Sequence, residues 1–311
     1  MTRIACIGLT TADPEGLAAF YHQAFGCQRT GVAHYHGERF SQLMGLADAE
    51  ARGLRLALGR QNVELLAFMR PGRPYPSDIA ADDPRFQHIA IVVSDMREAY
   101  GRLSRCLGWA PITYPAPQRL PASSGGVIAF KFRDPEGHPL ELLAFPDGAM
   151  PPAWGGQHGH GPCLGIDHSA IVVADTARSI DFYSRMLGFS RAGGSLNSGE
   201  EQHRLDGVAD PVVEVTNLAP DTAPPHLELL CYRSPAAPRE IAALPETNDI
   251  AATRLVLEVG DLSGVVRKLA AARARFVSAG IVALDRRRWA AVIRDPDGHL
   301  LLLESDGAKA G

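Results

Sequence analysis

Residues 166–175, IDHSAIVVAD, repeat the pattern of residues 86–95, FQHIAIVVSD. Each is a short run of β-branched residues closed by an Asp, which is typical of a strand that leads into a helix N-cap. Weaker copies occur at 4–13 and 253–261, and in all four copies an Asp follows one marked position by seven residues. This shared spacing predicts a fold built from four internal repeats.

Each repeat continues in the same order after its Asp. Apolar residues at helical spacing follow, and Gly26, Gly108 and Gly188 stand where a helix C-terminal glycine is expected in the first three repeats. Each repeat closes with a Leu-rich strand, at 63–68, 140–145, 227–232 and 300–304, and in the first three a Glu is its second residue. The turns at 134–138 and 295–299, DPEGH and DPDGH, have hairpin chemistry. The predicted unit is therefore a strand, a helix and three strands.

Stretches rich in Pro and Gly separate the repeats. The longest defines a linker at 148–162, and its His158 and His160 are interpreted as linker residues rather than ligands. We predict one domain at 1–150 and a second at 163–306. The modules within them are expected at 1–70, 84–147, 163–234 and 250–306.

Composition excludes several classes of protein. The 311 residues carry 31 basic and 35 acidic side chains without long blocks of one sign, which argues against a nucleic-acid partner and a polybasic membrane anchor. No apolar run approaches the roughly 18–20 residues of a membrane span. Five scattered cysteines without a CxxC pair favour reduced thiols, so a cytoplasmic protein is expected.

The repeated unit, with His on its first strand and Glu on its last, resembles the vicinal oxygen chelate superfamily. This group includes glyoxalase I, extradiol ring-cleaving dioxygenases and bleomycin-resistance proteins. The resemblance covers about residues 3–305 and is strongest at the turns before the last strands and at 182–189, FYSRMLGF. It implies an α+β fold of four tandem βαβββ modules that form two cup-shaped mixed β-sheets flanked by helices.

The resemblance also implies where a metal would bind. In the superfamily, two modules form a cup, and the ligands come from the first and last strands of both. The matching first-strand positions here are Cys6, His88, His168 and Arg254, and the last-strand positions are Glu64, Glu141, Glu228 and Leu302. The second and third modules keep both His and Glu, the first keeps the Glu alone, and the fourth has lost both.

Two pairings of the modules are open. If the second and third modules share a cup, His88, Glu141, His168 and Glu228 converge, and the other cup holds Glu64 beside Arg254, where a salt bridge is possible. If modules pair in chain order, Glu64 joins His88 and Glu141, as in ring-cleaving dioxygenases. We favour the first pairing, because it collects the intact ligand positions in one cup.

A metal is also expected on physical grounds. Two carboxylates and two imidazoles facing one cavity would cost several kcal/mol per buried charge if unpaired. One divalent ion of Zn, Ni, Co, Fe or Mn matches these ligands. A single His or Glu on a strand is usually a structural or solvent-facing residue, but the same pair recurs here in two modules.

The expected function is that of a metal-dependent enzyme acting on a small substrate chelated through adjacent oxygens. Glyoxalase I-like lyase or isomerase chemistry is implied, with a metal-stabilised enediolate and Glu141 or Glu228 as catalytic proton carrier. The alternatives are a non-haem Fe(II) extradiol-type dioxygenase, which prefers two His and one carboxylate, and a metal-free ligand-sequestering protein.

Candidate substrate contacts lie in the third module. Asn197, Gln202 and Arg204 belong to residues 195–204, expected on that module's second strand and its approach, and they could donate to a carboxylate or carbonyl. A solvated hairpin is the competing interpretation. The expected partner is a small molecule, and the protein is expected to be a monomer or homodimer.

Overall fold

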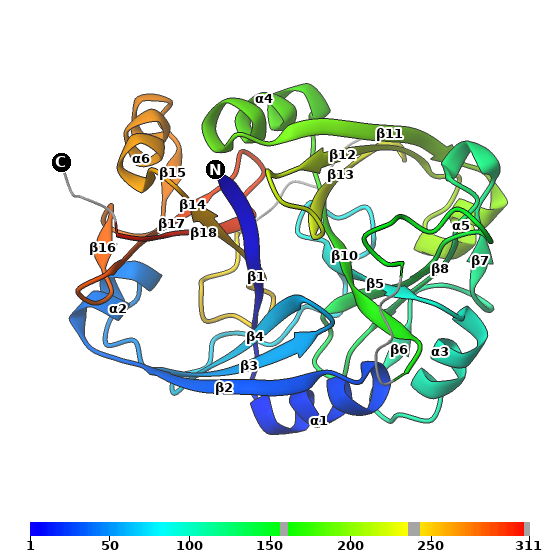
Figure 1. Ribbon diagram of the computed structural model, residues 1–311, viewed down its shortest axis with the longest axis horizontal. Helices are drawn as coiled ribbons and strands as arrows, with labels where there is room; N and C mark the ends of the chain where they lie inside the picture. The colour runs from blue at the N-terminus through cyan, green and yellow to red at the C-terminus, as the bar shows by residue number, and fades with distance from the viewer. Residues whose placement is uncertain (156–160, 236–242, 308–311) are drawn as a thin grey trace.

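The computed structural model describes residues 1–155, 161–235 and 243–307. The two linker histidines, His158 and His160, lie outside the described residues. Two mixed β-sheets form, and Figure 1 shows them side by side, each curved, with helices on their outer faces. Within the described residues, no helix combines the length and apolar character needed to cross a bilayer.

The first sheet is built by the first and fourth modules. Its strands run in the order β15-β17-β18-β14-β1-β4-β3-β2, and β16 pairs with β17. The first module comprises β1 (Thr2–Thr10), α1 (Pro14–Phe25), β2 (Gln28–Tyr35), α2 (Glu38–Met44), β3 (Ala51–Leu58) and β4 (Gln61–Phe68). The fourth comprises β14 (Arg254–Val259), α6 (Leu262–Ala271), β15 (Arg275–Phe276), β16 (Val282–Ala283), β17 (Arg288–Arg294) and β18 (Leu300–Asp306).

The second sheet is built by the second and third modules. Its order is β11-β12-β13-β10-β5-β9-β8-β6, and β7 pairs with β8. The second module comprises β5 (Gln87–Val93), α3 (Met96–Leu103), β6 (Ala110–Pro111), β7 (Gln118–Arg119), the 3₁₀-helix η1 (Ala122–Ser124), β8 (Ile128–Arg133) and β9 (Pro139–Ala144). The third comprises β10 (Cys163–Val172), α4 (Thr176–Leu187), β11 (Ser190–Ser198), α5 (Glu200–Asp206), β12 (Val212–Ala219) and β13 (His226–Ser234).

The first strands of the modules join the two halves of each sheet. Strand β10 lies antiparallel to β5, and β1 lies antiparallel to β14. The favoured pairing of the second with the third module is therefore confirmed, and the chain-order pairing is wrong. Each sheet combines one module from residues 1–150 with one from residues 163–306. The division into domains at 1–150 and 163–306 therefore stays a prediction, which describes how the sequence repeats.

The repeated Asp acts as predicted. Asp13, Asp95, Asp175 and Asp261 each cap a helix by accepting a hydrogen bond from a backbone N–H three residues on. Helices α1 and α4 end at left-handed glycines, Gly26 and Gly188. The expectation that Gly108 ends a helix is wrong, because α3 already ends at Leu103 and Gly108 lies beyond it.

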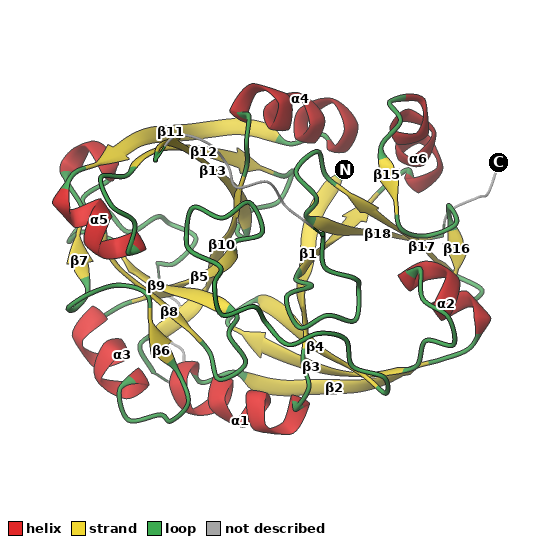
Figure 2. Cartoon of the chain, turned by 180° about the vertical axis from the view of Figure 1, so that it is seen from behind, coloured by secondary structure: helices red, strands yellow, loops and turns green. Residues whose placement is uncertain are grey.

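The two Asp-Pro-x-Gly-His turns connect the sheets to each other. His138 Nδ1 lies 2.9 Å from the Asp134 carboxylate, and its Nε2 lies 2.9 Å from the carbonyl oxygen of Thr10 in the other sheet. The Tyr21 hydroxyl of α1 donates to the same Asp134 at 3.0 Å. Helices α1, α3, α4 and α6 lie on the outer faces of the two sheets (Figure 2), and their buried residues share one apolar core with the sheets. The inner faces are thereby left for sites.

Helix α5 closes one end of the second cup. It belongs to the third module, and it packs against β7 and β8 of the second module. In the first cup, α2 of the first module makes the same crossing to β16 and β17. There its Phe40, Leu43 and Met44 join a core with Leu66 and Phe68 on the inner face of the sheet. Part of the inner face of the first cup is therefore packed with apolar side chains.

Candidate metal centre

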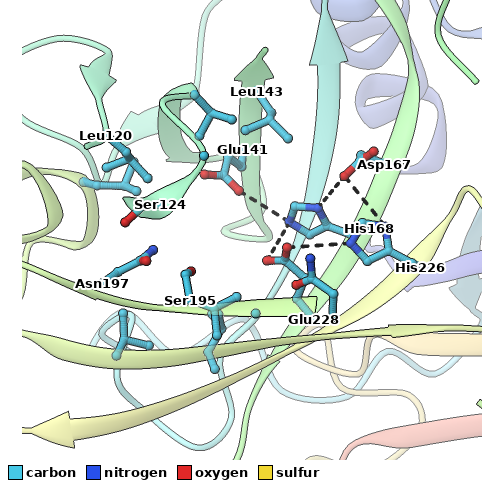
Figure 3. A pocket seen from close by; sticks show the side chains of 18 of the residues that line it. Leu120, Ser124, Glu141, Leu143, Asp167, His168, Ser195, Asn197, His226 and Glu228 are labelled. Carbon is cyan, nitrogen blue, oxygen red and sulfur yellow. Dashed lines mark hydrogen bonds and ion pairs between the residues drawn. The ribbon is translucent and has the colours of Figure 1, made fainter. Parts of the chain in front are cut away.

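The second sheet curls around a cavity of about 530 Å³. His88, Glu141, His168 and Glu228 all line it, from β5, β9, β10 and β13 respectively. The strand register explains why they meet. Ala170 on β10 is paired with His88 on one side and with Glu228 on the other. Residues paired across neighbouring strands point to the same face of a sheet, and for His88 and Glu228 this is the concave face. The structure thus brings the four predicted side chains into one cavity, and Figure 3 shows Glu141, His168 and Glu228 among them.

Three of the four side chains form a compact set. His88 Nε2 lies 3.0 Å from Glu141 Oε2, and His168 Nε2 lies 3.7 Å from the same oxygen. One ligand atom from each of these residues falls within 4.8 Å of the other two. Glu228 borders the set, with its Oε2 atom 3.3 Å from His168 Nε2.

Two further residues complete the cluster, Asp167 and His226. Asp167 Oδ2 lies 3.0 Å from His168 Nδ1, and its other oxygen accepts a 3.1 Å hydrogen bond from Trp154 Nε1. His226 Nε2 lies 3.7 Å from Glu228 Oε1. The Asp167 carboxylate fixes the ring of His168 so that Nε2 faces the cavity, which is the usual support for a metal-ligating histidine.

Sequence reasoning missed both residues, for different reasons. Consecutive residues of a strand normally face opposite sides, so Asp167 is not expected beside His168. The β10–β5 register shifts between Ile166 and His168, and this bulge lets both side chains reach the cavity. His226 could have been found, since it precedes Glu228 by two positions on a strand and so shares its face.

The charges of the cluster are coupled. Burial raises the pKa of Glu141, but the neighbouring His168 and His88 outweigh it and hold that pKa well below its usual range. Burial also opposes ionisation of Glu228, yet the charge of His168 and contact with His226 lower its pKa. The pKa of His168 is raised because the Glu228 and Asp167 carboxylates outweigh burial, whereas burial lowers the pKa of His88.

The cluster fits a divalent cation. His168 Nε2 is buried and makes no hydrogen bond, although two carboxylate oxygens lie within 4 Å. Two carboxylates largely shielded from water need a positive charge nearby, and imidazole with carboxylate is the donor set of borderline divalent metals. His88, Glu141 and His168 would hold such an ion, with Glu228 beside it.

Two of the three predicted substrate contacts lie at the cavity, and the third does not. Asn197 and Gln202 line the cavity, and both are buried. Arg204 is exposed and pairs with Glu200 at 2.8 Å, which does not support its predicted role. The reason is that residues 200–206 form helix α5 rather than a strand. On a helix, a residue two positions from Gln202 faces nearly the opposite side.

The first cup carries a different set. Glu64 accepts a 2.7 Å hydrogen bond from the Tyr35 hydroxyl and pairs with Arg55 at 3.4 Å. The suggested Glu64–Arg254 salt bridge is therefore replaced by these contacts, and Arg254 donates to Thr10 instead. Burial raises the pKa of the Cys6 thiol well above its usual value, so it is no ready thiolate ligand.

Comparison with known proteins agrees with the fold and the repeat. The family model described as the Glyoxalase/Bleomycin resistance protein/Dioxygenase superfamily matches residues 3–142 and 165–303. The chain belongs to this superfamily. The expected four-module α+β fold is thereby confirmed. No curated protein has significant similarity to this sequence.

Solved structures of this superfamily share the architecture over nearly the whole chain. Glyoxalase I from Zea mays superposes with a TM-score of 0.62 at 15% identity, covering 98% of this chain and 92% of that one. A putative dioxygenase from Bacillus subtilis gives a TM-score of 0.60 at 12% identity, covering 97% and 84%. At these identities, the likeness concerns the fold alone.

Proposed function

We propose that this superfamily member is a metal-dependent enzyme that binds a small substrate through adjacent oxygens and transfers a proton next to a carbonyl group. The observation that supports this most is the buried Nε2 atom of His168, which lies between Oε2 of Glu141 and Oε2 of Glu228 without a hydrogen bond. An unpartnered nitrogen between two buried carboxylates is an arrangement that a cation would complete.

His88, Glu141 and His168 would hold the cation, which we propose to be one of Zn, Ni, Co, Fe or Mn. When bound, it would polarise the substrate carbonyl and so acidify the neighbouring C–H bond. The cavity of about 530 Å³ has room for a small molecule beside the cluster. Its apolar wall includes Leu120, Leu143 and Leu205, which would limit the entry of water.

Glu228 is the better placed of the two carboxylates to carry the proton. It stands at the edge of the compact set, and its side chain is 17% exposed, whereas that of Glu141 is 7% exposed and contacts both imidazoles. Burial opposes ionisation of Glu228, but the neighbouring His168 and His226 lower its pKa, and a bound cation would favour the ionised form in the same way. An ionised carboxylate facing the cavity can accept a proton and return it to a neighbouring atom.

Solvent exchange tests this proposal without knowledge of the natural substrate. Protein reconstituted with Zn²⁺ or Ni²⁺ is incubated in D₂O with a panel of small α-hydroxyketones and α-hydroxyaldehydes, and loss of the α-proton signal is followed by NMR. We expect exchange that needs the added metal and disappears with a chelator. Metal-free protein that neither binds these ions nor promotes exchange would contradict the proposal.

A second candidate is a non-haem Fe(II) oxygenase of the ring-cleaving type. It is favoured by one observation, that the compact set within 4.8 Å is two histidines and one carboxylate, His88, His168 and Glu141. Such a face leaves positions for oxygen and a bidentate substrate. Oxygen uptake with catechols by the Fe²⁺-loaded protein, and the lack of it with Zn²⁺, would select this function over the first.

A further inference from the structure

A buried carboxylate, Asp206, organises the end of the cavity formed by α5. Lys131 Nζ donates to its Oδ1 atom at 2.6 Å. Gln202 Nε2 and the Tyr232 hydroxyl donate to its Oδ2 atom at 2.6 and 2.7 Å. All four residues line the cavity. Asp206 is therefore surrounded by donors from β8, α5 and β13, which fix one another.

This arrangement decides which atom Gln202 presents to a ligand. The two ends of a glutamine amide are usually interchangeable, and the hydrogen-bond network decides between them. Here the NH₂ group must face Asp206, because turning the amide would place its oxygen against a carboxylate oxygen at 2.6 Å. The Oε1 atom is consequently fixed as an acceptor, and it is buried without a partner.

The fixed acceptor is connected to the metal centre through Asp206 and Lys131. Lys131 and Glu141 are directly opposed on the antiparallel strands β8 and β9, so their side chains leave the same face about 5 Å apart at Cβ. Gln202 and Lys131 meet at Asp206. Gln202 and the cluster line the same cavity of about 530 Å³, so a ligand in this cavity can be contacted by both.

Two more buried oxygens lack partners on the same wall, Oδ1 of Asn197 and Oδ1 of Asn217. Figure 3 shows Asn197 across the cavity from His168. The side-chain amides of Asn197 and Asn217 can rotate to exchange their oxygen and NH₂ group, whereas the amide of Gln202 is held by Asp206. A ligand donor is thus required at Gln202 and is tolerated along the rest of the wall.

The charges of the residues that line the cavity also disfavour an anionic ligand. Among the described residues that line the cavity, Lys131 is the single lysine or arginine, and Asp206 pairs with it. Glu141, Asp167 and Glu228 add three further carboxylates. Even with a divalent cation bound, this lining gives an incoming anion little compensation for lost water.

We infer that the cavity selects substrates that carry a hydroxyl or N–H donor at the end remote from the chelating oxygens, received by Gln202 Oε1, and that it rejects substrates with a carboxylate there. The class is thus a neutral or cationic small hydroxy- or amino-carbonyl compound. This inference rests on the proposed function, since the metal holds the other end of the ligand.

The test uses hydroxamates, which chelate metals through two adjacent oxygens. Three series share their chelating end and chain length but end in a hydroxyl, a methyl or a carboxylate: γ-hydroxybutyrohydroxamate, valerohydroxamate, succinomonohydroxamate and their homologues. Binding to the Zn²⁺-loaded protein is measured by calorimetry, for the wild type, Gln202→Met and the control Tyr232→Phe, which removes a donor to Asp206 but keeps Gln202 fixed.

We expect the best hydroxyl probe to bind the wild type about tenfold more tightly than the methyl probe, as one hydrogen bond to a buried acceptor would give, and the carboxylate probe to bind most weakly. Gln202→Met should lose this preference while binding the methyl probe undiminished, which also shows that it is folded. Tyr232→Phe should keep the preference.

Tightest binding of the carboxylate series, or an unchanged preference in Gln202→Met, would overturn the inference and leave the proposed function standing. Equal binding of all three series would also overturn the inference and leave the proposed function standing. If the Zn²⁺-loaded protein binds none of the hydroxamates, the proposed function fails, and the inference fails with it.

Discussion

The Nε2 atom of His168 lies 3.3 Å from the Oε2 atom of Glu228 on the neighbouring parallel strand. The two residues are close because Glu228 pairs with Ala170, two positions after His168, so both side chains face the cavity. Their contact is an ion pair without a hydrogen bond, and Glu141 Oε2 lies 3.7 Å from the same nitrogen. Two acidic oxygens around one imidazole nitrogen are the geometric basis of the proposed metal centre.

Asp167→Asn should weaken the affinity for Zn²⁺ about ten- to a hundredfold, because the amide loses the charge that orients the His168 ring. Competition with a chromogenic chelator measures this. Glu64→Gln is the matched control, since it occupies the corresponding last-strand position in the first cup, and its affinity should stay at the wild-type value. Equal affinities for all three proteins would show that Asp167 does not support a ligand.

The two carboxylates of the second cup should behave differently. Glu141→Gln should lower the affinity for Zn²⁺ more than Glu228→Gln does, because Glu141 belongs to the compact set and Glu228 borders it. Glu228→Gln should instead slow α-proton exchange at least about a hundredfold at saturating metal, as expected for loss of a proton carrier. If the exchange rate falls only in proportion to metal occupancy, Glu228 is a ligand and carries no proton.

How far the sequence could predict this site is clear from particular residues. His88, Glu141, His168 and Glu228 could be found because they recur at matching positions of a repeat, which needs no knowledge of packing. The pairing of the second with the third module could be favoured because it collects the intact ligand positions, but establishing it requires knowing which first strands meet across long stretches of chain. The β5–β10 contact supplies that information.

For each residue whose role the sequence did not predict, the cause is local. Asp167 escapes detection because a bulge breaks the alternation of the strand. Arg204 is expected on the second strand of its module or on the approach to it, whereas it lies on helix α5 and faces solvent. The role of Asp206 depends on donors from three separate elements and leaves no mark in any one of them. The pattern of a repeat thus predicts its shared ligands, whereas residues that distinguish one module from another need the structure.

Arg254→Met should raise the free energy of unfolding by about 1–3 kcal/mol, measured by urea denaturation. The guanidinium is buried, and its Nε and Nη1 atoms have no hydrogen-bond partner, so its removal relieves an uncompensated charge. Burial lowers the pKa of Arg254 to about 10, in keeping with this cost. Thr10, its partner, keeps its bonds to the carbonyls of Thr247 and Ala252. A clear loss of stability would show that Arg254 holds the first cup together.

His138 should make the protein less stable as the pH rises. Its Nδ1 faces the Asp134 carboxylate and its Nε2 faces the carbonyls of Thr10 and Ile250, so both nitrogens donate only when the ring is protonated. Burial lowers the pKa of His138, but Asp134 outweighs it, and the net pKa is raised.

The sign of the effect follows from the raised pKa. The stabilisation is complete below the ordinary histidine pKa of about 6.5 and is lost as the pH rises through the higher pKa of the folded state. Urea denaturation at a series of pH values, compared with His138→Gln, measures this contribution. The difference between the two proteins should shrink above that pKa; a difference that grows with pH would contradict the assignment.

The most direct measurement is an anomalous difference map from crystals grown with Zn²⁺ and collected at the zinc absorption edge. The account predicts one strong peak in the second cup, within ligand distance of His88, Glu141 and His168, and none beside Cys6, Glu64 and Arg254 in the first cup. A second cup without a peak at saturating Zn²⁺, or a peak in the first cup instead, would contradict it.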